Sequence, residues 1–368
     1  MNRRGFLKAT SCALVPYTLG NALLAQNVAA ASSSIDLTIA GYPFEHIRRL
    51  MTGKVKIEGC DVQYQVGKIG DLNTHVFSGP RTLDVTEIGL IPFILAYAND
   101  DFRAYSLVPV FPLRMFRHRS IFVRSDSGIN QPADLKGKRV GTPGYSSTSL
   151  TWIRGMLHDE YGVRPEDIQW VVSAKDSSTK DAGKISKQEN VIPDGISISV
   201  GPEGKDESDL LIDREVDALF HAAEPRAFIE RHPKVTRLFK NVRRTEQDYY
   251  AKTGVFPIMH AVAIRNSLVE EHPWLPRAVF NAYSESKAQA YADMQEKWFL
   301  RTLPWFAQEL DTTQALMGRN FFTYGIAPNR KTLEALLRYA HEQGLARRKL
   351  AIEDLFEPST LGLIDHKD

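Results

Sequence analysis

Apolar and polar residues alternate in short segments along residues 35–97, and a stretch with helical spacing follows each segment. The expected elements come in turn at 35–40 (strand), 45–51 (helix), 62–66 (strand), 72–77 (helix), 84–88 (strand) and 91–97 (helix). Strands that alternate with helices at such short intervals are typical of an α/β fold, in which helices cover the faces of a sheet.

The alternation continues through the middle of the chain, and helices dominate after it. Further strands are expected at 105–110, 120–124, 168–172, 216–220 and 259–265, and helices at 149–161, 209–214, 273–297, 303–318 and 330–343. Residues 175–209 differ, because they are rich in Lys, Asp, Ser and Gly and alternate only weakly, at 196–200. A loop of this length is usually functional or disordered, so a surface hairpin or a lid is expected there.

The first residues read as an export signal. Arg3 and Arg4 are followed by Phe-Leu-Lys, then by a weakly apolar stretch at 9–25 and three alanines at 29–31. This order matches a twin-arginine signal, and the apolar stretch is shorter than the roughly 20 residues that span a bilayer. We expect residues 1–31 to be this signal, read by the twin-arginine translocase, and the mature protein to be periplasmic. A basic helix that stays on the protein is the alternative.

Charge and cysteine content narrow the possible partners. The chain has 46 Lys and Arg against 44 Asp and Glu, and removal of the signal takes away three cations and no acid. The mature chain is then close to neutral, which gives no general attraction to nucleic acid or anionic lipid. Only Cys60 remains, so no intrachain disulfide is expected. The roughly 335 mature residues exceed what a single core usually holds, which predicts two domains.

Several segments resemble type 2 periplasmic binding proteins. Residues 126–141 are similar to the passage from lobe one into lobe two, 216–219 to the last strand of lobe two, and 261–273 to the return into lobe one. The resemblance implies two α/β lobes joined by two crossing strands, with C-terminal helices and a ligand in the cleft between the lobes. The implied parts are lobe one at 35–123 and 259–368, and lobe two at 124–258 with an inserted loop at 175–209.

Four blocks narrow the resemblance to the 4,5-dihydroxyphthalate decarboxylase family. They are residues 109–120, 249–260, 273–276 and 316–318. The family implies a carboxy-lyase that removes CO2 from 4,5-dihydroxyphthalate or a related aromatic carboxylate bound between the lobes. The alternative is a periplasmic solute-binding protein that captures an aromatic or other small organic anion for the permease of an ABC-type transporter, without catalysis.

Three segments carry candidate substrate-binding residues. Arg114 and Arg117 precede a crossing strand, and arginine binds carboxylates through paired hydrogen bonds. The candidates of the loop that opens a helix, where free N–H groups favour anions, are Tyr145, Ser146, Ser147 and Thr148. Glu224 and Arg226 follow the strand at 216–220, and strand ends in such folds face the cleft. A basic surface turn, helix capping and surface charge are the respective alternatives.

His118 and His260 are the candidate catalytic residues. Loss of CO2 from a dihydroxylated ring requires a proton at the carbon that held the carboxylate, and histidine can supply it near neutral pH. A structural role is the alternative for both. His221 and Glu224 could also bind a metal, but no recognised metal-ligand spacing supports this. No cofactor is therefore predicted, and a divalent metal is left open.

Overall fold

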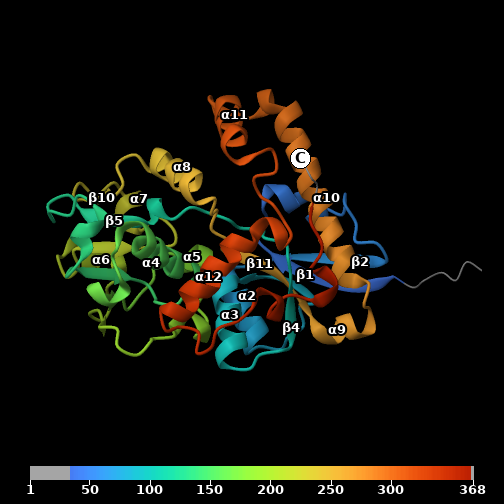
Figure 1. Cartoon of the computed structure of the whole chain (residues 1–368), viewed down its shortest axis with the longest axis horizontal. Helices are drawn as coiled ribbons and strands as arrows, with labels where there is room; N and C mark the ends of the chain where they lie inside the picture. The colour runs from blue at the N-terminus through green and yellow to red at the C-terminus, as the bar shows by residue number, and fades with distance from the viewer. Residues whose placement is uncertain (1–33, 366–368) are drawn as a thin grey trace, which may run out of the picture. The chain divides into compact units, whose positions relative to one another are not determined.

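The strands of the computed structural model, which describes residues 34–365, form two sheets (Figure 1). The predicted export signal lies outside the described residues. The first sheet has the strand order β2-β1-β3-β11-β4, and the second has the order β10-β5-β9-β6-β7-β8. The first sheet takes one strand from a distant part of the chain, because the chain passes from the first lobe into the second and later returns to the first.

The first sheet holds the beginning of the described chain. Its strands are β1 (Ile35–Gly41), β2 (Cys60–Val66), β3 (Val85–Gly89), β4 (Tyr105–Val108) and β11 (His260–Arg265). β1 runs parallel to β2 and β3, whereas β11 runs antiparallel to β3 and β4. The helices between these strands are α1 (Arg48–Met51), α2 (Ile69–Phe77) and α3 (Leu90–Asn99). Every residue of β3 is buried, because both faces of this central strand are covered.

The second sheet holds the middle of the chain. Its strands are β5 (Ile121–Arg124), β6 (Arg139–Thr142), β7 (Gln169–Val172), β8 (Ile198–Val200), β9 (Ala218–Phe220) and β10 (Val235–Arg237). The helices of this lobe are α4 (Thr148–Tyr161), α5 (Thr179–Ala182), α6 (Glu207–Ile212), α7 (Arg226–Ile229) and α8 (Val242–Thr253). β6 is parallel to β7 and β9, and β5 is antiparallel to β9 and β10.

Four helices close the chain, namely α9 (Asn266–Glu271), α10 (Leu275–Glu296), α11 (Phe306–Met317) and α12 (Arg330–Glu342). α12 packs against α3 of the first lobe and α4 of the second, so this C-terminal helix connects both lobes (Figure 1). No helix of residues 34–365 is both long and apolar enough to cross a membrane.

The two-lobed α/β architecture predicted from the sequence is confirmed, and two details differ. The segment 175–209 was expected to form a hairpin or lid, but its strand β8 pairs in parallel with β7, so the hairpin is wrong. Parallel neighbours need a connection of a dozen or more residues, and this segment supplies one. β5 pairs in the second sheet, whereas residues 121–123 were assigned to lobe one.

Candidate active site

A cavity of about 310 Å³ lies where the two lobes meet. Its walls come from the ends of β1, β3, β6 and β9, from the start of β11 and from the inserted segment. The carboxyl ends of parallel strands are where open α/β sheets usually bind ligands. The polar and charged residues of the lining are Tyr42, Arg117, Ser147, Thr148, Ser149, Asp176, Ser178, Asp181, Glu189 and His260.

The N-terminus of α4 opens onto this cavity. The Ser147 hydroxyl caps the helix by accepting the N–H of Leu150 at 3.3 Å. Thr148 and Ser149 follow it in the cavity wall, and the N–H groups of a first helical turn have no partner inside the helix. These N–H groups and the helix dipole together favour an anion at this end of the cavity.

Arg117 lies beside that helix end, in a segment that crosses between the lobes. Its guanidinium is almost fully buried and donates from Nη1 to the carbonyl of Ala222 at 2.7 Å. Its Nε contacts the Met259 thioether at 3.1 Å, and the Ser149 hydroxyl contacts the same sulfur at 3.6 Å. Burial lowers the pKa of Arg117 to about 9, so the side chain remains charged at neutral pH. The cation and the helix end therefore converge on one wall.

His260 is held by a buried carboxylate. Its Nδ1 lies 2.5 Å from Oε1 of Glu87, and Oε2 of Glu87 accepts the N–H of Tyr42 at 2.8 Å. The Tyr42 ring stacks on the imidazole with centroids 6.1 Å apart. Because a carboxylate accepts the hydrogen bond, Nδ1 carries the proton and Nε2 is the atom left for chemistry. A histidine oriented in this way is suited to carry a proton to or from a ligand.

A second buried histidine lies behind the opposite wall. Nε2 of His221 is 3.6 Å from Oδ1 of Asp176, which lines the cavity, and 3.4 Å from Oε1 of Glu207. Burial alone would lower the pKa of His221, but the two carboxylates outweigh it and raise the pKa.

These three side chains are a possible metal-ligand set, since their ligand atoms lie within 4.8 Å of one another. However, Nδ1 of His221 accepts the N–H of Ala223 at 3.1 Å, so a neutral ring carries its proton on Nε2. Nε2 is the atom that faces the carboxylates, and a metal would need its lone pair. The arrangement fits a ring whose Nε2–H faces the carboxylates of Asp176 and Glu207 better than it fits a metal centre.

The chain is 37% identical over 332 residues to the 4,5-dihydroxyphthalate decarboxylase of Comamonas testosteroni, across 89% of this chain and 98% of that protein. The chain belongs to the 4,5-dihydroxyphthalate decarboxylase family. The Pseudomonas putida protein of the same name is 32% identical over 218 residues, which are 59% of this chain and 82% of that protein. Residues 107–188 match the family described as NMT1/THI5 like.

A solved structure shows the same fold. It is described as a periplasmic sulfonate-binding protein of an ABC transporter from Methylobacillus flagellatus, at 15% identity and a TM-score of 0.54. The match covers 89% of this chain and 93% of that one. This likeness shows the type 2 periplasmic-binding-protein fold alone, since the identity is low.

The structure brings four of the predicted site residues of this family member into the cavity wall, and places the others outside it. Those in the wall are Arg117, Ser147, Thr148 and His260. Those outside the lining are Arg114, His118, Tyr145, Ser146, Glu224 and Arg226.

Arg114 and His118 are packed into the interior behind the cavity. The Arg114 guanidinium donates to the carbonyls of Phe256 and Thr323, so it ties the crossing segment to the C-terminal region. His118 lies edge-on to Phe239 and Tyr249 with centroids 5.1 Å away from each, and it is almost fully buried. Neither side chain lines the cavity.

Two residues of the predicted loop point away from the cavity. The Tyr145 ring packs on Trp170 and lies under the guanidinium of Arg154, while its neighbours Ser147 and Thr148 face the ligand space. The Ser146 hydroxyl donates to the carbonyl of Gln188 and so fixes the inserted segment. The structure therefore places the helix end of the predicted loop in the cavity wall and the two residues before it outside the lining.

Glu224 and Arg226 lie on the surface in ion pairs. Glu224 pairs with Arg119 and Arg237, and Arg226 pairs with Asp206 and Asp209. The chain turns away after β9, so only the first residues past the strand, Ala222 and Ala223, reach the cavity. A position shortly after a strand end therefore does not by itself place a side chain in the cavity.

Sequence reasoning missed Glu87, Tyr42, Met259 and Asp176. A signal for Glu87 was available, because it is the one charged residue of an otherwise uncharged strand, β3. Glutamate is almost never fully buried unless it is paired. The other three carry no comparable sequence signal.

Proposed function

We propose that the inter-lobe cavity binds 4,5-dihydroxyphthalate or a closely related dihydroxylated aromatic carboxylate and releases CO2 from it. The observation that carries this proposal is the presence, in one cavity, of an anion-binding wall and a histidine oriented by a carboxylate. Arg117 and the first turn of α4 form the wall, and His260 with Glu87 forms the proton carrier. The two related decarboxylases support the same activity.

The chemistry assigns a role to each part of the cavity. A ring hydroxyl para to the departing carboxylate loses its proton and pushes an electron pair toward the ring carbon that bears this carboxylate. His260 delivers a proton to that carbon, the bond to the carboxylate breaks, and its electrons restore the aromatic ring. The hydroxyl proton passes to a carboxylate of the inserted segment, Asp176 or Asp181, and returns to the phenolate oxygen as the product forms. His260 regains its proton from solvent, so the net change is one proton gained by the ring for each CO2 released.

The remaining groups of the ligand need partners of the opposite kind. The retained carboxylate needs donors, which Arg117 and the N–H groups at the start of α4 supply. The ring hydroxyls need acceptors, which Asp176 and Asp181 of the inserted segment supply. Donors and acceptors thus come from different walls, which orients the ring.

We also propose that the protein works in the periplasm after export by the twin-arginine route. The sequence of residues 1–31 is the support for this proposal. The first 35 residues fused to a reporter should direct it to the periplasm, and Arg3→Lys with Arg4→Lys should keep the fusion in the cytoplasm. Export that persists in the double variant would count against the twin-arginine route.

The activity is tested with the purified protein and 4,5-dihydroxyphthalate. We expect CO2 release and, in D2O, one deuterium on the ring carbon that lost the carboxylate. His260→Asn should lower kcat by about 10²–10⁴-fold, the usual contribution of a positioned acid or base. Arg117→Gln should instead weaken binding, by on the order of 2–5 kcal/mol.

Arg119→Gln is the matched control, because Arg119 lies in the same segment but pairs with Glu224 on the surface. It should leave both constants nearly unchanged. Tight binding of several aromatic acids without turnover of any would refute the decarboxylase and support the transporter-linked binding protein. Unchanged turnover in His260→Asn would remove His260 from the proposed mechanism.

A further inference from the structure

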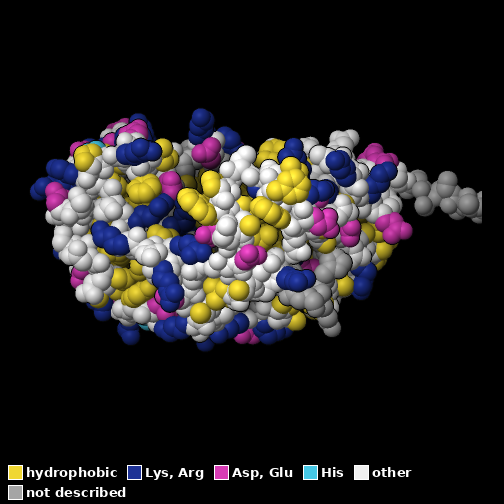
Figure 2. Space-filling model, turned by 90° about the horizontal axis from the view of Figure 1, so that it is seen from above, with side chains coloured by type: hydrophobic (Ala, Val, Ile, Leu, Met, Phe, Trp, Pro, Cys, Tyr) yellow, Lys and Arg dark blue, Asp and Glu magenta, His cyan; other side chains and the backbone are white. Residues whose placement is uncertain are grey.

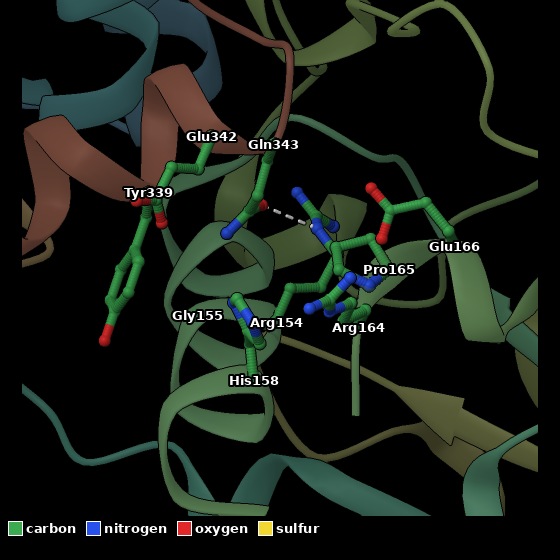
Figure 3. A pocket seen from close by; sticks show the side chains of 9 residues that line it. All are labelled: Arg154, Gly155, His158, Arg164, Pro165, Glu166, Tyr339, Glu342 and Gln343. Atoms are coloured by element: carbon green, nitrogen blue, oxygen red, sulfur yellow. Dashed lines mark hydrogen bonds between the residues drawn. The ribbon is translucent and has the colours of Figure 1, made fainter. Parts of the chain in front are cut away.

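A second, smaller cavity of about 180 Å³ lies between α4, α12 and the turn at residues 164–166 (Figure 3). It is distinct from the inter-lobe cavity and shares no lining residue with it. The lining residues are Arg154, Gly155, His158, Arg164, Pro165, Glu166, Tyr339, Glu342 and Gln343. Most of them carry polar or charged side chains, which a packing void would not require.

Arg154 is the unusual member of this set. Its side chain is about 1% exposed, and its Nη1 and Nη2 have no hydrogen-bond partner within residues 34–365. Only Nε is engaged, by donating to Oε1 of Gln343 at 2.8 Å (Figure 3). The guanidinium also lies 3.8 Å from the ring centroid of Tyr145. A cation–π contact offsets part of the desolvation cost but leaves four N–H groups without acceptors.

A buried charge of this kind normally has a charged partner, because isolation from water is costly. Burial lowers the pKa of Arg154, yet a guanidinium does not lose its proton in proteins. Within residues 34–365, no carboxylate accepts a hydrogen bond from its Nη1 or Nη2. The N–H groups of Arg154 therefore need an acceptor from solution, and an anion is the acceptor that matches their charge.

The rest of the lining favours an anion as well. Arg164 lines the same cavity and has no ion pair in the described part of the chain, while Glu342 is already paired with Arg338 at 2.8 Å. Glu166 is the one acid of the lining that is left to balance two arginines. Figure 3 shows that Arg154 comes from α4 and that Arg164 comes from the turn that also carries Glu166, and both line the cavity.

A glycine brings the two helices close enough to enclose the site. A Cβ at Gly155 would lie 2.4 Å from ring atoms of Tyr339. The Tyr339 ring therefore packs directly on the backbone of α4 at this glycine. Tyr339 belongs to α12, whereas Arg154 belongs to α4. The walls of the cavity thus come from the second lobe and from the C-terminal helix.

We propose that this cavity binds a small oxyanion, such as phosphate, sulfate or a simple carboxylate, with Arg154 as the principal ligand. The oxyanion accepts hydrogen bonds from Nη1 and Nη2, and Arg164 closes the open side. Because it links α4 to α12, the bound anion stabilises the packing of the C-terminal helix on the second lobe. An anion that binds only the folded protein raises its stability with concentration.

The test is calorimetric titration of the full mature protein with phosphate, sulfate, acetate and chloride, each alone. Arg117→Gln is the background, so that the inter-lobe wall does not contribute. We expect one site that prefers the oxyanions to chloride, since bidentate acceptors match the guanidinium fork. Phosphate against acetate then distinguishes an inorganic oxyanion from a carboxylate as the better ligand.

Substitutions locate the site. Arg154→Met should weaken binding by about ten- to a hundredfold, the loss expected for hydrogen bonds to a charged group. Arg164→Gln should weaken it several-fold, whereas Glu166→Gln should strengthen it because a competing carboxylate is removed. The last two positions are exposed, so these variants keep the test valid even where Arg154→Met does not fold.

Several outcomes would overturn the proposal. One is binding that Arg154→Met leaves unchanged, and another is the absence of oxyanion binding at millimolar concentrations. A third is a lower thermal midpoint of Glu166→Gln without added anion, because Glu166 would then be the natural partner of Arg154.

Discussion

His118 provides a direct test of the difference between a catalytic and a structural histidine. The side chain is enclosed by Phe239 and Tyr249, and neither ring nitrogen has a hydrogen-bond partner among residues 34–365. Burial lowers its pKa from 6.5 to about 4. His118→Phe keeps an aromatic ring of similar size in an aromatic environment, so the packing should be retained.

The sign and size of the effect follow from the lowered pKa. In the unfolded chain this histidine binds a proton below about pH 6.5, whereas the folded protein resists the proton down to about pH 4. His118 therefore does not lower the unfolding free energy above about pH 6.5. As the pH falls toward 4, this histidine lowers the unfolding free energy by about 1.4 kcal/mol per pH unit. The lowering of about 2.5 pH units predicts a total loss of roughly 3 kcal/mol.

Urea unfolding of wild type and His118→Phe at several pH values between 4 and 8 measures this loss. The difference in unfolding free energy should grow in favour of the variant as the pH falls. His46, whose pKa is also lowered to about 4, should still contribute its own slope in both proteins. Parallel pH profiles would refute the reasoning. Loss of turnover in a folded His118→Phe protein would instead restore the catalytic role predicted from the sequence.

Three further substitutions probe other parts of the structure. Glu87→Gln should lower kcat by about ten- to a hundredfold with little change in KM, because the hydrogen bond to His260 loses its charge; a pure KM effect would contradict this, and Glu224→Gln is the surface control. His221 has a raised pKa, so its stabilising effect is full below about pH 6.5 and is lost as the pH rises through the folded value. Urea unfolding between pH 6 and 9 should show this decline in wild type but not in His221→Gln. Gly155→Ala should cost about 1–3 kcal/mol in unfolding free energy, since its Cβ would overlap the Tyr339 ring; an unchanged free energy would mean that α12 moves freely on α4.

The fold could be predicted from the spacing of apolar residues, because both lobes are built from regular strands and helices. Short strands alternate with helices, and the predicted strands at 35–40, 62–66 and 84–88 became β1, β2 and β3. The inserted segment was the exception. Its weak alternation at 196–200 predicts a strand but does not identify the strand with which it pairs. Only the three-dimensional structure shows that β8 lies parallel to β7. A hairpin and a parallel crossover have the same local pattern.

The site was predictable only in part, because side-chain direction is not a property of local sequence. Arg114 and Arg117 are three residues apart and look equivalent, yet one ties down the C-terminal region and the other lines the cavity. Tyr145 and Ser147 differ in the same way. Glu87 and His260 lie far apart in the sequence, and the antiparallel pairing of β3 with β11 brings them together. The family resemblance identified the sequence blocks that contain the site, but the register of the sheet determines which of their residues line the cavity.

The charge balance of the inter-lobe cavity favours turnover over simple capture. The titratable residues of its lining include one arginine, Arg117, one histidine, His260, and three acids, Asp176, Asp181 and Glu189. An aromatic dicarboxylate therefore finds donors for one carboxylate at Arg117 and the start of α4, while the inserted segment contributes acids. A protein built only to hold a dianion would compensate both charges, since an unpaired buried carboxylate is costly. Loss of CO2 removes one of the two charges, so the same imbalance that weakens substrate binding assists the reaction and product release.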